Sequence, residues 1–207
     1  MKNKIKFIDL FAGIGGFHLA LNKVNGECLF ASEWDKECQK IYEKNFHLKP
    51  FGDITKINEK EIPKHDVLCA GFPCQAFSIS GKRQGFKDTR GTLFFDVARI
   101  IKHHQPKLIL LENVKNFLTH DNGNTISVVK KTLEELNYNV FYKVLNSSNF
   151  GIPQKRERIY IVAFNKKLKI NEFEFPSNQN IFVSLKDYLL PDNLTKELVL
   201  NRDDVQL

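Results

Sequence analysis

The sequence predicts an α/β protein built on a doubly wound, mostly parallel sheet that ends in an antiparallel strand. Strand and helix patterns alternate from about residue 4 to residue 165, the order that sets parallel strands side by side with helices on both faces. The early strand patterns are short apolar runs, as expected of strands buried on both faces. The last two, NVFYKVLN and RERIYIVAF, alternate apolar and polar residues, which favours an antiparallel pair.

The first half of the alternating region contains two strand patterns, each followed by a helix pattern. IKFIDLFAG is a short apolar run that ends in glycines, and GFHLALNKV then carries apolar residues at helical spacing. ECLFASEW has the pattern of a second strand. The segment DKECQKIYEKNF follows as a helix, for which Asp35 is the candidate N-cap.

The second half adds two buried strands, HDVLCAGFP and PKLILLENV, and two amphipathic helices, TLFFDVARIIKH and TISVVKKTLEEL. The apolar face of the first of these helices consists of Leu93, Phe94, Val97, Ile100 and Ile101. After residue 165 the pattern fades, and SLKDYLLPDNL supports at most one short helix. We therefore expect one domain over residues 1–165 and a linker or tail over residues 166–207.

The composition is that of a globular protein with a basic surface. With 42% hydrophobic residues the chain can bury a sizeable core, and its net charge of +7 favours a polyanionic partner. No apolar run is long enough to span a bilayer, and Asp9 interrupts the N-terminal apolar segment, so we expect a cytoplasmic protein without a signal peptide. The cysteines form no C-x-x-C pair, and we therefore expect neither a metal site nor disulfides.

A glycine cluster follows the first strand, in the segment DLFAGIGG. Glycines at this place let the backbone approach a ligand, and Glu33, about 20 residues further on, is placed to take ribose hydroxyls. The dinucleotide-binding pattern G-x-G-x-x-G is not met, because His18 stands where its last glycine belongs. The cluster favours a nucleotide-like ligand, and a turn without any ligand is the alternative.

Cys74 stands at the end of the third predicted strand, between Pro73 and Gln75, and is poorly placed for simple core packing. The loop that follows carries four cations, Lys82, Arg83, Lys87 and Arg90. Nearby positive charge favours the thiolate, which is the reactive form of cysteine. Cys74 is therefore the candidate nucleophile, whereas the other three cysteines have the pattern of small buried residues.

Glu112 follows directly on the buried run LILL of the fourth predicted strand. Partial desolvation at such a position tends to raise the pKa of a carboxyl group, which suits a proton donor; a helix cap is the alternative. Arg156 and Arg158 stand two residues apart at the start of the last strand, so they share one face. They are candidates to hold phosphates or the edge of a substrate, and a surface salt-bridge ladder is the alternative.

Six segments, in this order and spacing, resemble those of DNA (cytosine-5) methyltransferases of the bacterial restriction–modification type: DLFAGIGGFHLAL, ASEWD, GDI, GFPCQAFSISGKRQGFKDTRGTLFFDVARII, LLENVKNF and GIPQKRERIYIVAF. The resemblance runs from about Lys4 to Phe164. It implies an S-adenosylmethionine-dependent methyltransferase fold, with residues 1–165 as the catalytic domain. It also implies S-adenosyl-L-methionine as cofactor, S-adenosyl-L-homocysteine as product, double-stranded DNA as substrate, and association with a bacterial nucleoid.

The resemblance also assigns roles to residues. It implies that Cys74 is the nucleophile, that Glu112 binds N3 of the cytosine, and that Arg158 is a further contact on the base. It implies that Glu33 binds the ribose hydroxyls and that Trp34 stacks near the adenine. The other cofactor-binding positions would be Phe11, Ala12, Gly13, Gly15, Asp53, Ile54, Pro73 and Leu93. The positions that hold DNA or the active-site loop would be Gln75, Ser78, Ser80, Arg90 and Arg156.

These residue types suit the chemistry, because C5 of cytosine is a poor nucleophile. Attack of the Cys74 thiolate on C6, with N3 held by Glu112, makes C5 enamine-like and able to accept the methyl group. The base must leave the helical stack, which costs a few kcal/mol. The basic loop after Cys74 is placed to close over the flipped nucleotide and its phosphates.

The chain contains no counterpart of the family's target-recognition region or of its final asparagine-containing segment. We expect either the catalytic subunit of a split enzyme, whose second polypeptide supplies recognition, or a truncated, inactive cofactor-binding fragment. An RNA cytosine-5 methyltransferase of similar fold is a further alternative.

Three other classes are disfavoured by specific residues. A zinc nucleobase deaminase would need a second cysteine where Phe77 stands, and an H-x-E motif that does not occur. A nicotinamide dehydrogenase would need the complete glycine fingerprint. A non-enzymatic DNA-binding module would need neither Cys74 nor Glu112 beside a cofactor loop.

Overall fold

The computed structural model describes residues 4–73, 93–179, 181, 183–191 and 194. The chain divides into two compact units. The first comprises residues 1–145 and 157–175, and the second comprises residues 146–156 and 176–207.

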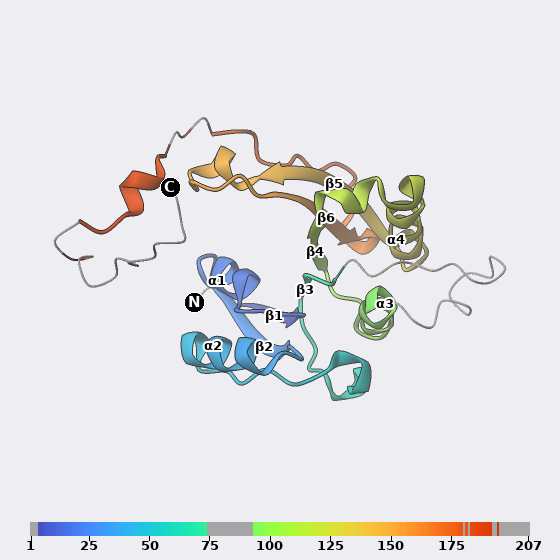
Figure 1. Cartoon of the computed structure of the whole chain (residues 1–207). Helices are drawn as coiled ribbons and strands as arrows, with labels where there is room; N and C mark the ends of the chain where they lie inside the picture. The colour runs from blue at the N-terminus through green and yellow to red at the C-terminus, as the bar shows by residue number, and fades with distance from the viewer. Residues whose placement is uncertain (1–3, 74–92, 180, 182, 192–193, 195–207) are drawn as a thin grey trace. The chain divides into compact units, whose positions relative to one another are not determined.

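The first unit holds the sheet, apart from the last residue of one strand. Its six strands lie in the order β2-β1-β3-β4-β6-β5 (Figure 1). Their bounds are β1 Ile5–Leu10, β2 Gly26–Ser32, β3 Val67–Ala70, β4 Leu108–Val114, β5 Tyr138–Asn146 and β6 Glu157–Asn165. Helices α1 (Gly16–Asn22) and α2 (Lys36–Phe46) lie on one side, and α3 (Leu93–His104) and α4 (Asn124–Glu135) on the other. The predicted doubly wound fold class is confirmed.

The last strand in sequence is not at the edge of the sheet. Strands β2, β1, β3 and β4 are parallel, and β6 runs antiparallel to β4 and lies between β4 and β5. In this register Glu112 pairs with Tyr160 and Val114 pairs with Arg158. The sequence periodicity predicted a terminal antiparallel pair, whereas the insertion of β6 beside β4 depends on tertiary packing. The insertion brings Arg158 to the carboxyl end of β4.

The larger part of the core lies between the sheet and helices α3 and α4. Four of the five residues predicted for the apolar face of α3 are at most 1% exposed, and the fifth, Leu93, is half-buried at the start of the helix. A side chain of this kind contributes roughly 1.5–3 kcal/mol when fully buried. On the other side of the sheet, Phe7 and Cys69 pack against Phe17 of α1.

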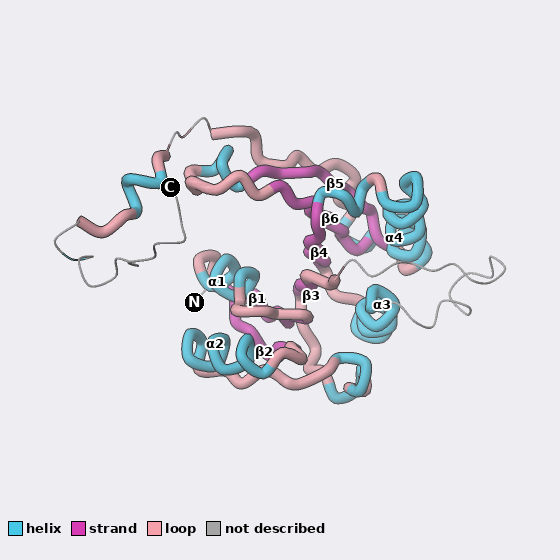
Figure 2. The backbone as a smooth tube through the Cα atoms, viewed as in Figure 1, coloured by secondary structure: helices cyan, strands magenta, loops and turns pink. Residues whose placement is uncertain are grey.

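Apart from Asn146, the last residue of β5, the described part of the second unit consists mainly of loops and short turns of 3₁₀ helix (Figure 2). The Asn146 Oδ1 accepts hydrogen bonds from the backbone N–H groups of Ser148 at 3.2 Å and Arg156 at 3.1 Å. A 3₁₀ turn spans Leu185–Tyr188, and the Tyr188 hydroxyl donates to the Gly151 carbonyl at 3.3 Å. This turn lies where the sequence allowed one short helix.

Residues 166–175 belong to the first unit, although the sequence pattern fades there. The Phe173 ring lies 5.4 Å from the Phe164 ring and 6.0 Å from the Phe141 ring, centroid to centroid. Residues 166–175 therefore cover part of the β5–β6 region. The predicted domain boundary at residue 165 stays a prediction. Within the described residues, no helix combines the length and apolar character needed to cross a membrane.

Candidate active site

A tight glycine loop joins β1 to α1 at the carboxyl end of the parallel strands. Phe11, Gly13 and Gly15 all have positive φ angles, of 54°, 54° and 93°. The Ala12 N–H donates to the Ser32 carbonyl at 3.0 Å, which holds the loop against the end of β2. At Gly15 a Cβ would stand 2.0 Å from the Phe46 ring, whereas at Gly13 it would meet no atom of the described residues within 4 Å. The loop therefore packs against the Phe46 ring at Gly15, and it is open to a ligand at Gly13.

Glu33 is locked in place beside this loop. Its side chain is only 8% exposed. The Oε2 accepts a hydrogen bond from the Gly13 N–H at 2.8 Å, and the Oε1 accepts one from the Asp35 N–H at 2.9 Å. The Gln39 side chain donates to the Glu33 backbone carbonyl. Because each carboxylate oxygen can accept more than one hydrogen bond, Glu33 retains acceptor capacity for the hydroxyls of a ligand at the loop.

The other predicted adenine-side residues differ in their surroundings. Trp34 is 77% exposed and offers a free aromatic surface next to Glu33. Asp53 Oδ1 accepts from the Thr55 hydroxyl at 2.8 Å and from its N–H at 3.0 Å, and these hydrogen bonds lower the Asp53 pKa. The Ile54 side chain lies in the main core. Asp53 therefore serves as a helix cap in this structure, and the adenine contacts predicted for it and Ile54 stay predictions.

The nucleophile candidate lies outside the described residues. Cys74, Gln75, Ser78, Ser80 and Arg90 all fall in residues 74–92. The two predicted cofactor residues that flank this segment are described: Pro73 is exposed at the end of β3, and Leu93 is half-buried at the start of α3. The segment therefore begins at the carboxyl end of the sheet, which is where ligands of doubly wound folds bind.

Glu112 and Arg158 form an ion pair across β4 and β6. The Arg158 Nε lies 3.0 Å from the Glu112 Oε1, and about a fifth of each side chain is exposed (22% and 23%). The Arg158 Nη1 also donates to the Glu157 carbonyl at 2.8 Å, which limits its rotation. On the other side of Glu112, a Cβ at Gly71 would stand 3.7 Å from the Glu112 Oε2. The carboxylate therefore faces the segment that leads to Cys74.

Asn113 is a site residue that the sequence analysis missed. Its side chain is 3% exposed, and its Nδ2 donates to the Phe72 carbonyl at 2.8 Å. Its Oδ1 accepts from the Val114 N–H at 2.9 Å. Asn113 thus ties the end of β4 to the backbone two residues before Cys74. Its position in the sequence could have indicated this role, because Asn113 is a polar residue directly after Glu112 at the end of a buried strand.

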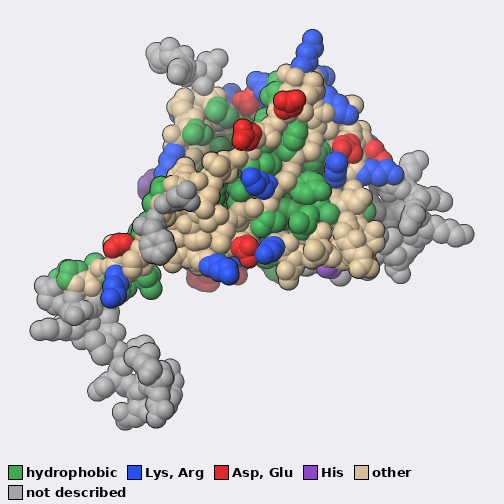
Figure 3. Space-filling view, turned by 90° about the horizontal axis from the view of Figure 1, so that it is seen from above, with side chains coloured by type: hydrophobic (Ala, Val, Ile, Leu, Met, Phe, Trp, Pro, Cys, Tyr) green, Lys and Arg blue, Asp and Glu red, His purple; other side chains and the backbone are tan. Residues whose placement is uncertain are grey.

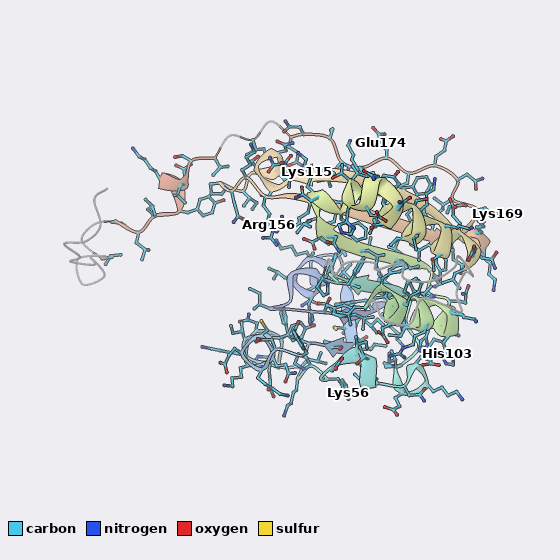
Figure 4. All side chains as sticks on the ribbon, turned by 45° about the vertical axis from the view of Figure 1, so that its right-hand side comes forward. Lys56, His103, Lys115, Arg156, Lys169 and Glu174 are labelled. Carbon is cyan, nitrogen blue, oxygen red and sulfur yellow. The ribbon has the colours of Figure 1, made fainter. Side chains whose placement is uncertain are left out.

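A second ion pair follows at the same end of β4. The Lys115 Nζ lies 3.0 Å from the Glu157 Oε1, and Figure 4 labels Lys115 near the end of this strand. Arg156, the other arginine predicted to hold DNA, belongs to the second unit. Among the described residues no group of three His, Cys, Asp or Glu side chains is arranged to hold a metal ion.

The comparisons with known proteins agree with this arrangement. The model of the C-5 cytosine-specific DNA methylase family matches residues 5–205. The chain is 58% identical to the Type II methyltransferase M.HhaI of Haemophilus parahaemolyticus over 97% of its own length and 62% of that protein. It is 54% identical to M.HpaII of Haemophilus parainfluenzae over 90% of its own length and 53% of that protein. The chain thus spans a little over half the length of these curated relatives.

A solved structure has the same fold. A DNMT2 mutant of Spodoptera frugiperda is 26% identical, with a TM-score of 0.66 over 88% of this chain and 55% of that one. This fold is that of S-adenosylmethionine-dependent methyltransferases, as the resemblance implied. Because the family model matches nearly the whole chain, the protein belongs to the C-5 cytosine-specific DNA methylase family.

Proposed function

We propose that the chain transfers a methyl group from S-adenosyl-L-methionine to C5 of a flipped cytosine in duplex DNA, through a covalent bond between Cys74 and C6. The observation that carries the proposal is the Glu112–Arg158 pair, which faces the backbone that leads to Cys74. Family membership supports the reaction class. The names of the relatives, which are Type II methyltransferases, support it as well.

The residues around the glycine loop fit this cofactor. The loop is open at Gly13, where a ligand can approach the backbone closely. Glu33 keeps acceptor capacity for ribose hydroxyls, and exposed Trp34 offers a surface on which an adenine can stack. When bound, S-adenosylmethionine supplies an electrophilic methyl group. The chain's part is to hold that group beside the cytosine and to activate C5.

Activation of C5 needs a nucleophile at C6 and a donor at N3. The Cys74 thiolate forms a bond to C6, and the electron pair displaced through the ring is accommodated at N3, which the Glu112 carboxyl group holds. C5, activated in this way, would accept the methyl group that the cofactor supplies, and the sulfur would keep the electron pair of the broken bond. A base then takes the C5 proton, and the electron pair left behind restores the C5–C6 double bond as the Cys74 thiolate leaves C6. Arg158 supports this role because it orients Glu112 and lies beside the same edge of the site.

DNA contacts would come from polar and basic residues around this site. Gln75, Ser78, Ser80 and Arg90 follow the nucleophile in sequence, and Arg156 precedes β6. On the face seen in Figure 3, lysine and arginine side chains are spread among acidic ones and do not gather in one patch. The net charge of +7 therefore favours general attraction to a polyanion, and short-range contacts must supply the register on the duplex.

A second polypeptide that carries target recognition is part of the proposal. The chain spans 62% of M.HhaI and 53% of M.HpaII. Co-purification from the native host, followed by mapping of methylated cytosines, tests for such a partner and for its recognition sequence. Sequence-specific methylation by the purified chain alone would count against a need for a partner.

The reaction itself is tested by transfer of labelled methyl groups from S-adenosylmethionine. Duplex DNA and transfer RNA are offered separately to the chain, alone and with any co-purified polypeptide. Label in cytosine C5 of DNA supports the proposal. Label in RNA alone favours the RNA alternative, and no label with either substrate favours the inactive fragment.

A further inference from the structure

Asp9 carries a deeply buried carboxyl group. It is the second-last residue of β1 and is 1% exposed. Neither carboxylate oxygen forms a hydrogen bond within the described part of the chain. An ionised carboxylate in such a place is strongly disfavoured unless an opposite charge is supplied, and the usual result is a neutral acid. The proposed reaction gives this residue no role so far.

Within the described residues, the groups around Asp9 supply no positive charge. Burial raises the Asp9 pKa well above its ordinary range, and the Glu33 carboxylate raises it further. The His18 backbone N–H opposes this shift, although it lies outside hydrogen-bonding geometry. The His18 ring on α1 is kept neutral because burial lowers its pKa, and its Nδ1 is 2.7 Å from the Tyr42 hydroxyl of α2.

Two thiols complete the surroundings, Cys28 on β2 and Cys69 on β3. Burial raises the pKa of Cys28 to about 11 and that of Cys69 well above its ordinary range, so both are neutral. Asp9 therefore has no counter-charge among the described side chains that surround it, which are His18, Cys28, Tyr42 and Cys69. A cation that arrives nearby would stabilise its ionised form.

The glycine loop is where a cation would arrive. Asp9 precedes this loop by one residue and lies close to the first turn of α1, into which the loop leads. Glu33 is bonded to the loop through Gly13. Two carboxyl groups therefore border a loop that is open at Gly13. A positively charged ligand at this loop would be attracted by the Glu33 carboxylate and would favour the ionised form of Asp9, whereas a neutral ligand of the same shape would do neither.

We propose that Asp9 makes the glycine loop discriminate between a cationic sulfonium ligand and its neutral thioether counterpart. This inference rests on the proposed function, in which the loop holds S-adenosylmethionine. The cofactor carries the sulfonium charge, and the product S-adenosylhomocysteine does not. Methyl transfer would remove the sulfonium charge that stabilises ionised Asp9. S-adenosylhomocysteine would therefore bind less tightly than S-adenosylmethionine, which would replace it.

Asp9→Asn tests the proposal, because the amide has the shape of the neutral acid but cannot ionise. Calorimetric titration of the full chain with each ligand gives two dissociation constants and their ratio. We expect the dissociation constant for S-adenosylmethionine to rise about tenfold, an effect typical of one partly screened charge, and that for S-adenosylhomocysteine to stay within about twofold. Equal changes for both ligands, or no change for either, would overturn the proposal.

Asp66→Asn is the matched control. Asp66 lies at the opposite end of the sheet and is paired with Lys107 at 2.9 Å. The Asp66→Asn variant should leave the ratio of the dissociation constants for S-adenosylmethionine and S-adenosylhomocysteine unchanged. A change of this ratio similar to that in Asp9→Asn would also overturn the proposal.

A measurement on the unaltered chain covers the case in which Asp9→Asn does not fold. The ¹³C resonance of the Asp9 carboxyl group should move from the protonated to the ionised position on addition of S-adenosylmethionine, and should not move with S-adenosylhomocysteine. The same resonance position with both ligands would overturn the inference and leave the proposed function standing. If neither ligand binds the unaltered chain, both fail.

Discussion

The Arg158 Nε lies 3.0 Å from the Glu112 Oε1, although the two residues are 46 positions apart in the sequence. The pair exists because β6 runs antiparallel to β4 and sets Arg158 opposite Val114, two residues beyond Glu112. Adjacent strands place such diagonal side chains within reach of each other when one of them is long. A carboxylate and its orienting cation are thereby fixed at the edge of the sheet from which the Cys74 segment departs.

The first prediction concerns Glu112→Gln. The amide keeps the shape of the side chain but cannot donate a proton to N3, so we expect kcat for DNA methylation to fall by a factor of about 10² or more. Steady-state methyl transfer measures this. Glu157→Gln is the matched control, since Glu157 of β6 forms an ion pair with Lys115, the residue that follows β4, and its substitution should change kcat by less than about twofold. A Glu112→Gln enzyme within fivefold of the unaltered rate would exclude the assignment.

The second prediction concerns Cys74→Ser. A serine hydroxyl is a much weaker nucleophile towards C6, so transfer should be abolished, while S-adenosylmethionine binding should stay largely intact. Cys38→Ser, at a half-buried cysteine on α2, should retain full transfer. Binding is followed by calorimetry and transfer by label incorporation. Turnover that survives in Cys74→Ser would refute its role as nucleophile.

The third prediction concerns Asn113→Ala. Loss of the Nδ2 donor leaves the Phe72 carbonyl without its partner, which should lower the free energy of unfolding by about 1–3 kcal/mol. Because this bond holds the backbone before Cys74, kcat should fall as well. Asn139→Ala removes a comparable bond, from Asn139 Nδ2 to the Ile170 carbonyl at 2.7 Å, and should lower stability without a change in kcat. Urea unfolding and steady-state kinetics separate the two effects, and an unchanged kcat in Asn113→Ala would show that the bond is only structural.

The fourth prediction compares two neighbouring glycines. Gly15→Ala places a Cβ 2.0 Å from the Phe46 ring at a φ of 93°, and the backbone conformation alone should destabilise the fold by about 1–3 kcal/mol. Gly16→Ala meets no atom within 4 Å at the first position of α1, and should be neutral or stabilise by about 0.5–1 kcal/mol. Urea unfolding of both variants tests this, and equal stabilities would contradict it.

The fifth prediction is a pH dependence of stability. Burial lowers the His65 pKa to about 4, and the ring Nδ1 donates to the Pro63 carbonyl at 2.8 Å, while the Nε2 has no partner within the described residues. The unfolded chain binds a proton near pH 6.5, so the unfolded state takes up more protons between pH 6.5 and 4. The free energy of unfolding should therefore decrease as the pH falls through this window, by up to about 3 kcal/mol, and level off below it.

The variant His65→Asn keeps a donor near the Nδ1 position but does not titrate, so it should lose most of this pH dependence. His47→Asn is the control, because His47 is an exposed helix cap in the left-handed conformation that asparagine tolerates. Unfolding measured from pH 8 to pH 4 compares the three proteins. A slope that persists in His65→Asn would assign the dependence to another group.

Local pattern accounts for much of the fold and of the site. The apolar runs around β1, β3 and β4 and the helical periodicity of α3 predicted elements that the structure contains. The glycine loop and Glu33 were predicted to face one ligand, and the bond from the Gly13 N–H to the Glu33 Oε2 brings them together. They lie together because parallel strands end at one edge of the sheet, so residues at strand ends meet there; the ligand itself stays a prediction.

The fold class, the family and the polar residues at the strand ends can all be predicted from the amino-acid sequence. Only folding places β6 between β4 and β5, and Arg158 therefore meets Glu112. Folding also brings Asn113 to the Phe72 backbone and buries Asp9 with no hydrogen-bond partner in the described part of the chain. The difference arises from how far apart in the sequence the interacting residues are. Periodicity and turn chemistry act within a few residues along the chain, whereas strand order, ion pairing and desolvation depend on segments that only folding brings into contact.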